Sequence, residues 1–532
     1  MTGKRLVGAA AVVAALTMLS RLAGFARILV FNGAVGPTYL GNAYTAANTI
    51  PNIIFELVAG GALASLVVPL LAGAVARQDR QQVGRTVSAL LGWVVVILVP
   101  LAVLVAVLAR PLVGLLMRAQ PAEAVDAGTD MLRVFAPQLP LYGVGIVLTG
   151  TLQTYRRFAW PVIAPLLSSL TVMAVYVAFG VLAGRGADIV GSGKQVDDAD
   201  LWLLSGGTTL AVAVLTLSLL IPLSRLRLRI RPTLRFDTHE VRALKPLVVA
   251  GIVTVGSQQL VLGLAIALSG YAGRGVVVVY SLAQTIFLLP WAVLAVPVAT
   301  TAYPALAEAG AGGAEGRDRF AAVLAPAVRT VVVLTSLGAA ALVVLAEPVA
   351  VILAELSSEP PDVGQLAGGI TWFAPGLIGY GLFALLSRAL YAGGNAYAAA
   401  WATGFGWAVA AATAVPLAAG LPLDRRVAAI AAANSIGMLV LGAALAVAVR
   451  ARAGGDAVAG AGRTVAAAVA SATVAATVAL TIRHLLWGGG TPDVPGAVAQ
   501  GMLCGVAVAV VFLAGVAVTD RRTLQRLIHR RG

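Results

Sequence analysis

Two arginines lie inside the first long apolar run of the sequence, where a charged side chain is costly. Arg21 and Arg27 are six positions apart, which on an α-helix separates them by about 9 Å along the axis and roughly 120° around it. Ionisable residues within a membrane-spanning helix usually face a cavity or a partner, and a guanidinium group can grip two phosphate oxygens at once. The pair therefore indicates a binding site for an elongated anion.

The next apolar run carries a polar stripe. Its polar residues recur every three or four positions, at Asn42, Thr45, Thr49, Asn52 and Glu56. At about 100° per residue they fall within an arc of roughly 80°, so one face of this helix is polar. The stripe predicts substrate-binding residues at Asn42, Asn52 and Glu56. Hydrogen bonds between helices would produce the same pattern, and Glu56 could instead neutralise an arginine of the first run.

Smaller polar groups occur in the second half of the chain. Gln284 and Thr285 in one apolar run and Arg388 in another are further predicted substrate-binding residues, with interhelical hydrogen bonding as the alternative. Gly24, between the two arginines, and Pro51, within the polar stripe, mark positions where a helix can bend. We predict that both act as hinges.

Residues suited to catalysis or metal binding are scarce. The three histidines, His239, His484 and His529, lie far apart, and the single cysteine, Cys504, excludes a disulfide within the chain. Gly-Ser-Gly-Lys194 is followed by Gln and so lacks the Ser or Thr of a nucleotide-binding loop. The sequence therefore predicts a secondary transporter and not an enzyme, with no metal or cofactor. A membrane potential or an ion gradient is the expected energy source.

Membrane-spanning helices must position these residues. Of the 532 residues 60% are hydrophobic and only 11% are charged, whereas soluble domains are about one-quarter charged. Because a bilayer-spanning helix needs about 20 apolar residues, the apolar runs predict an all-α polytopic membrane protein with about fourteen helices. The expected spans are 7–31, 39–74, 87–109, 131–154, 159–183, 201–224, 246–271, 276–303, 321–346, 369–392, 397–419, 427–449, 464–482 and 497–518.

The formal charge of +15 comes mostly from basic residues in alternate loops. Such loops face the cytoplasm, so we expect both termini to be cytoplasmic. Membrane topology accounts for most of the excess of basic residues. Membrane lipids are therefore expected partners, and nucleic acid is not.

The most basic loop, 225–245, follows the sixth expected helix and suggests a boundary. We predict an N-terminal six-helix lobe at 1–224, a cytoplasmic linker at 225–245, a C-terminal six-helix lobe at 246–450, and two more helices with a basic cytoplasmic tail at 451–532. Two six-helix lobes with the substrate path between them are typical of secondary transporters. The loop could equally be a simple charged connection.

The segment from Ser20 to Pro69 resembles the N-terminal signature of the MurJ/MviN lipid II flippases, which belong to the multidrug/oligosaccharidyl-lipid/polysaccharide exporter superfamily. The resemblance rests on Ser20-Arg21-Leu-Ala-Gly24-Phe25-Ala26-Arg27, Pro51-Asn52-Ile-Ile, Gly61-Ala62-Leu and Val-Val-Pro69, and further along on Arg157-Phe158, Ala164-Pro165, Leu289-Pro290 and Tyr303-Pro304.

The resemblance implies a flippase of the bacterial plasma membrane. Its substrate would be lipid II, a polyprenyl-pyrophosphate-linked glycopeptide, moved from the cytoplasmic to the outer leaflet by alternating access. Arg21 and Arg27 match the first-helix arginines that engage the pyrophosphate. The terminal helix pair would provide a groove for the lipid tail, and cell-wall synthesis proteins would be partners.

Some positions depart from the family pattern. Asn42 stands where many members have an acidic residue, a basic pair is missing near Glu56, and Thr285 replaces an arginine. Two alternatives therefore stay open: an exporter of another lipid-linked glycan or of drugs, and a non-transporting membrane scaffold for cell-wall synthesis.

Overall fold

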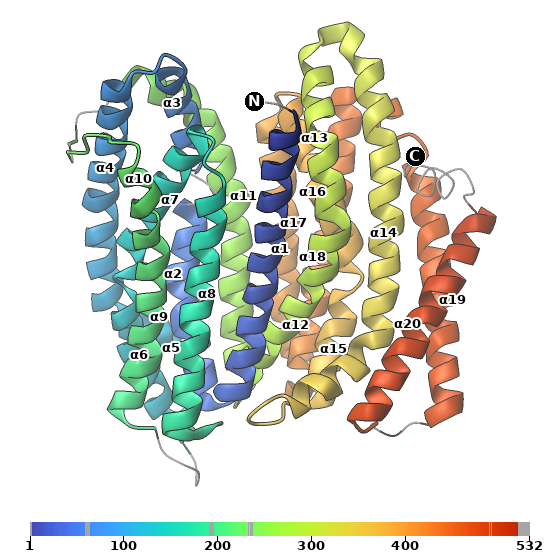
Figure 1. Ribbon diagram of the computed structural model, residues 1–532. Helices are drawn as coiled ribbons and strands as arrows, with labels where there is room; N and C mark the ends of the chain where they lie inside the picture. The colour runs from blue at the N-terminus through green and yellow to red at the C-terminus, as the bar shows by residue number, and fades with distance from the viewer. Residues whose placement is uncertain are drawn as a thin grey trace. The chain divides into compact units, whose positions relative to one another are not determined.

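The computed structural model describes residues 3–58, 64–190, 196–231, 233–234, 238–488, 490 and 492–519. The regular elements of these residues are helices (Figure 1). Gly61 and Ala62 of the sequence motif, part of the expected linker 225–245, and the expected tail from 520 onward lie outside the described residues.

The prediction of an all-α polytopic membrane protein is confirmed. Among the described residues, twelve helices are long and apolar enough to cross a membrane, or thirteen if the bent pair α15–α16, with its 45° break, forms one span. The expected span 39–74 is outside this count, because it is described as α2 (Tyr39–Glu56) and α3 (Ala64–Ala76), with residues 59–63 undescribed between them. The other expected spans each overlap one of the helices counted or the bent pair.

Contacts between residues group the chain into two compact units. Unit 1 comprises 1–259 together with two short segments from later in the chain, 273–278 and 356–359. Its helices, in addition to α2, α3 and the first part of α11, are α1 (Gly3–Ala34), α4 (Arg80–Val107), α5 (Ala109–Leu116), α6 (Ala122–Phe135), α7 (Gln138–Thr154), α8 (Ala159–Phe179), η2 (Gly180–Gly184), α9 (Asp198–Ser218) and α10 (Leu220–Ser224).

Unit 2 comprises 260–272, 279–355 and 360–532. It contains the end of α11 (Thr238–Gly270), most of α12 (Val276–Pro290), η3 (Trp291–Ala295), α13 (Val296–Ala311), α14 (Gly313–Glu355), α15 (Val363–Phe373), α16 (Gly376–Ala392), α17 (Ala396–Gly420), η4 (Leu423–Arg425), α18 (Arg426–Ala453), η5 (Gly455–Val458), α19 (Ala461–Trp487) and α20 (Val494–Thr519). The expected division into lobes at 225–245 stays a prediction.

Short polar side chains begin several of these helices by capping backbone N–H groups that have no partner in the first turn. Thr38 accepts from the N–H of Gly41 at the start of α2, and Asp79 accepts from that of Gln82 at the start of α4, both at 2.9 Å. Such caps place helix starts at the polar ends of apolar runs.

Small residues let the helices of unit 2 pack closely. A Cβ added to Gly379 of α16 would overlap the backbone of Met438 on α18, and one added to Gly437 would overlap Ala410 on α17. Because lipid tails are as apolar as the helices, the hydrophobic effect contributes little to helix association in a membrane. Close backbone contact at small residues is therefore a main source of the packing energy. In the same unit α19 and α20 pack on each other and on α14 (Figure 1).

Candidate functional site

The two arginines of the first helix lie on a continuous stretch of α1. The side chains of Arg21 and Arg27 are both exposed, and α1 runs from Gly3 to Ala34 without a break at Gly24. A Cβ added to Gly24 would meet nothing within 4 Å, so this glycine is not needed for close packing in this conformation. Since a charged group facing lipid is costly, an exposed arginine at this depth is expected to face water or a polar ligand.

Within unit 1, Arg27 interacts electrostatically with tyrosines of neighbouring helices. Its guanidinium group interacts electrostatically with the hydroxyl groups of Tyr44, Tyr142 and Tyr176. The Tyr44 hydroxyl is itself bonded to the hydroxyls of Tyr176 and Thr208, both at 2.8 Å. These buried hydroxyls therefore connect α2, α8 and α9 next to the arginine.

Tyr142 on α7 gathers several of the predicted site residues around it. Its hydroxyl donates to Oδ1 of Asn52 at 3.3 Å, and its ring lies 4.4 Å, centroid to centroid, from that of Phe55. Glu56 is exposed and interacts electrostatically with the same tyrosine, as Arg27 does. We call Arg27, Asn52, Phe55, Glu56 and Tyr142 the Tyr142 cluster. Tyr142 could not be predicted as a site residue from the sequence, because an isolated tyrosine in an apolar run is also a common packing residue.

Asn42, from the same polar stripe, does not join this cluster. It is fully buried, and its amide donates to Oε1 of Gln120 at 3.2 Å and to the carbonyl oxygen of Gly273 at 2.9 Å. Its Oδ1 accepts from the N–H of Val277 at 3.1 Å. Asn42 thus links α2 to the segment 273–278. Substrate binding by Asn42 stays a prediction, because in this conformation its amide bonds to other residues of the protein.

A group of charges lies near the start of α2. Arg274 donates from Nε to Oδ2 of Asp188 at 2.8 Å, and its Nη1 lies 3.4 Å from Oε2 of Glu359. The Asp188 carboxylate also accepts from the N–H groups of Tyr39 and Leu40. Burial alone would lower the pKa of Arg274, but the hydrogen bond and charge of Asp188 raise this pKa above its ordinary value. We call these five residues the Asp188 cluster.

The predicted site residues of unit 2 have local partners. Gln284 donates to the Tyr280 hydroxyl at 3.3 Å, and Thr285 donates to the carbonyl oxygen of Ser281 at 2.8 Å. Arg388 is half-buried and donates to the carbonyl oxygen of Ala384, one turn earlier in α16.

Arg388 also interacts electrostatically with the hydroxyls of Tyr303 and Tyr391. Of the three predicted residues in unit 2, Arg388 alone carries a charge, and it is the one whose side chain could attract an anion. Among the described residues there is no group of three or more His, Cys, Asp and Glu side chains arranged to hold a metal ion.

Comparison with known proteins identifies the family. The profile of the family described as lipid II flippase MurJ matches residues 31–492. The lipid II flippase MurJ of Burkholderia cenocepacia is 28% identical over 393 residues, which cover 71% of this chain and 72% of that protein. The probable lipid II flippase MurJ of Rhizobium meliloti is also 28% identical, with 68% of this chain and 65% of that protein covered. A Synechocystis relative of the same description is 27% identical, and the chain spans 43% of its length.

Solved structures show the same fold at lower identity. A structure described as lipid II flippase MurJ in an inward closed conformation matches with a TM-score of 0.75 and 18% identity, over 96% of this chain and 98% of that one. An inward-facing multidrug transporter of the MATE family matches with a TM-score of 0.66 and 17% identity, over 82% of this chain and 94% of that one. The chain is therefore a multi-pass membrane transporter, not an enzyme, and it belongs to the MurJ lipid II flippase family.

Proposed function

We propose that this chain translocates lipid II from the cytoplasmic to the outer leaflet of the bacterial plasma membrane by alternating access, with both termini in the cytoplasm. The observation that carries the proposal is the pair Arg21 and Arg27, both exposed on one continuous helix in a member of this family. The family match supports the substrate class, and the arginines supply a chemical reason for it.

The arginines suit a pyrophosphate. An α-helix separates two residues six positions apart by about 9 Å, so two guanidinium groups on flexible stems can reach both phosphates of one pyrophosphate from either side. Charge-assisted hydrogen bonds of this kind are roughly twice as strong as neutral ones. Lipid phosphodiesters carry a single phosphate, so this spacing favours the pyrophosphate-linked substrate over ordinary lipids.

The other members of the Tyr142 cluster suit the rest of the headgroup. Asn52 and Tyr142 offer hydrogen-bonding groups for sugar hydroxyls and peptide amides, and the exposed Glu56 carboxylate accepts hydrogen bonds or pairs with an ammonium group. In unit 2, Arg388, Gln284 and Thr285 are proposed as further substrate contacts.

We propose that a membrane potential or an ion gradient drives the cycle. Each elementary charge that crosses the whole field is worth about 2.3 kcal/mol per 100 mV. Moving a doubly charged pyrophosphate outward is therefore favoured when the outside is positive. Cell-wall synthesis proteins that use lipid II in the outer leaflet are the proposed protein partners.

Depletion of the protein in cells, with complementation by variants, tests the proposal. Lipid II should accumulate in the cytoplasmic leaflet on depletion, and Arg21→Gln/Arg27→Gln should fail to restore its export. Purified wild-type protein should bind lipid II and undecaprenyl pyrophosphate more tightly than a neutral lipid, and the double variant should lose at least tenfold of that preference. A matched control, Arg110→Gln/Arg118→Gln, removes the same charge from exposed positions outside the cluster and should behave as wild type.

Other outcomes separate the alternatives. Normal lipid II export without the protein excludes the proposal. Full complementation by the double arginine variant points to a scaffold, and drug-stimulated proton exchange in vesicles without lipid II binding points to a drug exporter.

A further inference from the structure

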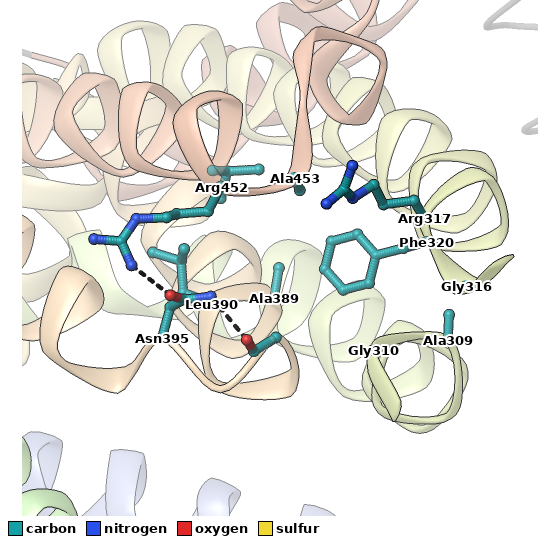
Figure 2. A pocket seen from close by; sticks show the side chains of 12 residues that line it. Ala309, Gly310, Gly316, Arg317, Phe320, Ala389, Leu390, Asn395, Arg452 and Ala453 are labelled. Carbon is teal, nitrogen blue, oxygen red and sulfur yellow. Dashed lines mark hydrogen bonds between the residues drawn. The ribbon is translucent and has the colours of Figure 1, made fainter. Parts of the chain in front are cut away.

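A small cavity lies at one end of the helices of unit 2, and Arg388 is not among the residues that line it, although its neighbour Ala389 is. Its volume is about 190 Å³, and it opens where α13, α16 and α18 end and α14 begins (Figure 2). A water molecule takes up about 30 Å³ of the liquid, so the cavity has room for about six. Pockets for drug-sized ligands start near 300 Å³. The cavity is therefore of a size to hold a lipid headgroup, and too small for a whole drug-sized molecule.

Close backbone approach forms the walls of the cavity. A Cβ added to Gly310 would overlap the carbonyl oxygen of Ala392 at the end of α16, and one added to Gly316 would overlap that of Ala309. Gly310 lets the end of α13 pack directly against α16, and Gly316 lets the start of α14 pack directly against the end of α13. The floor is apolar, because Phe320 and Ala389 are buried there.

Two arginines supply the charge of the cavity. Figure 2 shows Arg317 and Arg452 at opposite ends of the opening, with Ala453 between them. Arg452 donates to Oδ1 of Asn395, whose own amide donates to the carbonyl oxygen of Gly393 at 2.7 Å, so one guanidinium group is held in place.

Arg317, in the second turn of α14, makes no ion pair or hydrogen bond with a residue of the part of the chain that the structure describes. None of the lining residues that the structure describes is acidic. The lining therefore combines two cations with an apolar floor and places no anion opposite them.

We infer that this cavity binds the phosphate of an anionic phospholipid. Basic pockets between membrane helices near the polar end of a bundle are suited to anionic headgroups, because a phosphate gains both cations while the adjoining acyl chains stay in the lipid. Arg317 supplies donors to the phosphate, and Arg452, positioned by Asn395, adds attraction from the other end. A soluble phosphate compound shares this chemistry. The lipid is favoured because the site lies where helices end, at the level of headgroups.

Lipid retention by the purified protein tests this inference. Wild-type protein in neutral detergent should retain phosphatidylglycerol over phosphatidylcholine, measured by native mass spectrometry, and phosphatidylglycerol should raise its thermal unfolding midpoint. Arg317→Gln/Arg452→Gln should weaken phosphatidylglycerol binding at least tenfold. The control Arg319→Gln/Arg450→Gln removes the same charge from neighbouring exposed residues that do not line the cavity and should leave binding unchanged.

A second variant keeps both charges. Ala453→Leu narrows the opening at a partly exposed position and should also weaken binding, whereas a general electrostatic effect would leave it intact. Equal retention by wild type, the cavity variant and the control would overturn the inference. The protein could instead bind inorganic phosphate at micromolar concentration through Arg317 and retain no lipid. That result would show a phosphate site and overturn the proposal that its ligand is a phospholipid. Lipid II binding should be unchanged throughout, so this result is independent of the proposed function.

Discussion

Arg274 and Asp188 are 86 positions apart in the sequence, yet Nε of the arginine donates to Oδ2 of the aspartate at 2.8 Å. The Asp188 side chain is only 8% exposed, and it also accepts from the N–H groups of Tyr39 at 3.2 Å and Leu40 at 2.9 Å. One carboxylate therefore ties the segment 273–278 to the start of α2. Any motion that separates these segments must break this ion pair and leave a largely buried charge without its partner.

Asp188→Asn should loosen this connection. The amide keeps the shape of the side chain but loses the charge that pairs with Arg274, and its NH₂ group cannot accept from the N–H of Tyr39 or Leu40. We expect a loss of about 1–3 kcal/mol in the free energy of unfolding. We also expect faster labelling of a cysteine introduced by Val277→Cys, a fully buried position next to the cluster, in a protein whose native Cys504 has been replaced.

Asp126→Asn is the matched control for this prediction. It breaks the ion pair of Asp126 with Arg110, whose side chains are 54% and 70% exposed, and such pairs contribute about 0–1 kcal/mol. Its thermal unfolding and labelling should stay close to those of wild type. Equal effects of the two substitutions would mean that the Asp188 cluster does not hold the segments together.

Asn42→Ala should destabilise the protein without weakening headgroup binding. The substitution leaves the Gln120 amide oxygen, the Gly273 carbonyl oxygen and the Val277 N–H without their Asn42 partner in a buried place. Leaving a buried polar group unpaired costs about 1–3 kcal/mol, so thermal unfolding in detergent should occur at a clearly lower temperature. Lipid II affinity, measured below that temperature, should match wild type.

Thr49→Ala provides the comparison on the same helix face. Among the described residues its hydroxyl bonds only to the carbonyl oxygen of Thr45 in its own helix, at 2.7 Å, so its removal should change stability little. A tenfold loss of lipid II affinity in Asn42→Ala with unchanged thermal stability would instead support the substrate contact predicted for Asn42.

Tyr142→Phe should weaken headgroup binding without destabilising the protein, the reverse of the effects expected for Asn42→Ala. The ring contact with Phe55 at 4.4 Å is kept, while the hydroxyl that donates to Asn52 is lost. Because the bond is long and Asn52 is only half-buried, stability should change by no more than about 1 kcal/mol. Lipid II affinity should fall several-fold, since Asn52 is no longer held in place for the headgroup.

Tyr44→Phe removes a hydroxyl from a fully buried network with Tyr176 and Thr208 and should therefore cost stability while leaving affinity nearly unchanged. The two tyrosine variants should thus separate binding from folding. If both lower affinity equally, Tyr142 has no special position in the site.

The sequence was sufficient to predict the helices and the charged face of α1, because both follow from local patterns. A long run of apolar residues indicates a membrane span, and an arginine within such a run indicates a special role because burying its charge in a membrane costs free energy. The spans confirm the predicted helices. The role of the two arginines stays a prediction. The span at 39–74 is the expected span that overlaps none of the helices counted among the described residues, because it is described as two helices on either side of undescribed residues.

The partners of polar residues could not be predicted in the same way. Asn42 and Asn52 lie on one face of α2 with the same spacing pattern, yet the first is buried among Gln120, Gly273 and Val277 and the second meets Tyr142. Those partners are 78, 231, 235 and 90 positions away, so no helical periodicity contains them. Arg274 and Asp188 are 86 positions apart, so no local pattern pairs them either.

Gly24 lies between the two arginines of α1, where a bend would bring their side chains together. The helix is continuous through this glycine, and an added Cβ would meet nothing within 4 Å, so Gly24→Ala fits this conformation without strain. Alanine favours a helix over glycine by about 1 kcal/mol, so the variant should be as stable as wild type or slightly more so. If α1 must bend to bring Arg21 and Arg27 onto one pyrophosphate, the same substitution should slow lipid II transport several-fold.

Two companion variants show whether flexibility is the cause. Ala26→Gly combined with Gly24→Ala restores a flexible residue one half-turn away and should recover part of the transport rate. Gly33→Ala, whose Cβ would lie 3.2 Å from the carbonyl oxygen of Leu356, should instead lower thermal stability, because that glycine is needed for close packing. Transport, thermal unfolding and the labelling of cysteines at either end of the protein are to be measured on all three variants. A Gly24→Ala protein with normal transport and labelling would show that α1 does not bend at Gly24 during transport and that Gly24 is not a hinge.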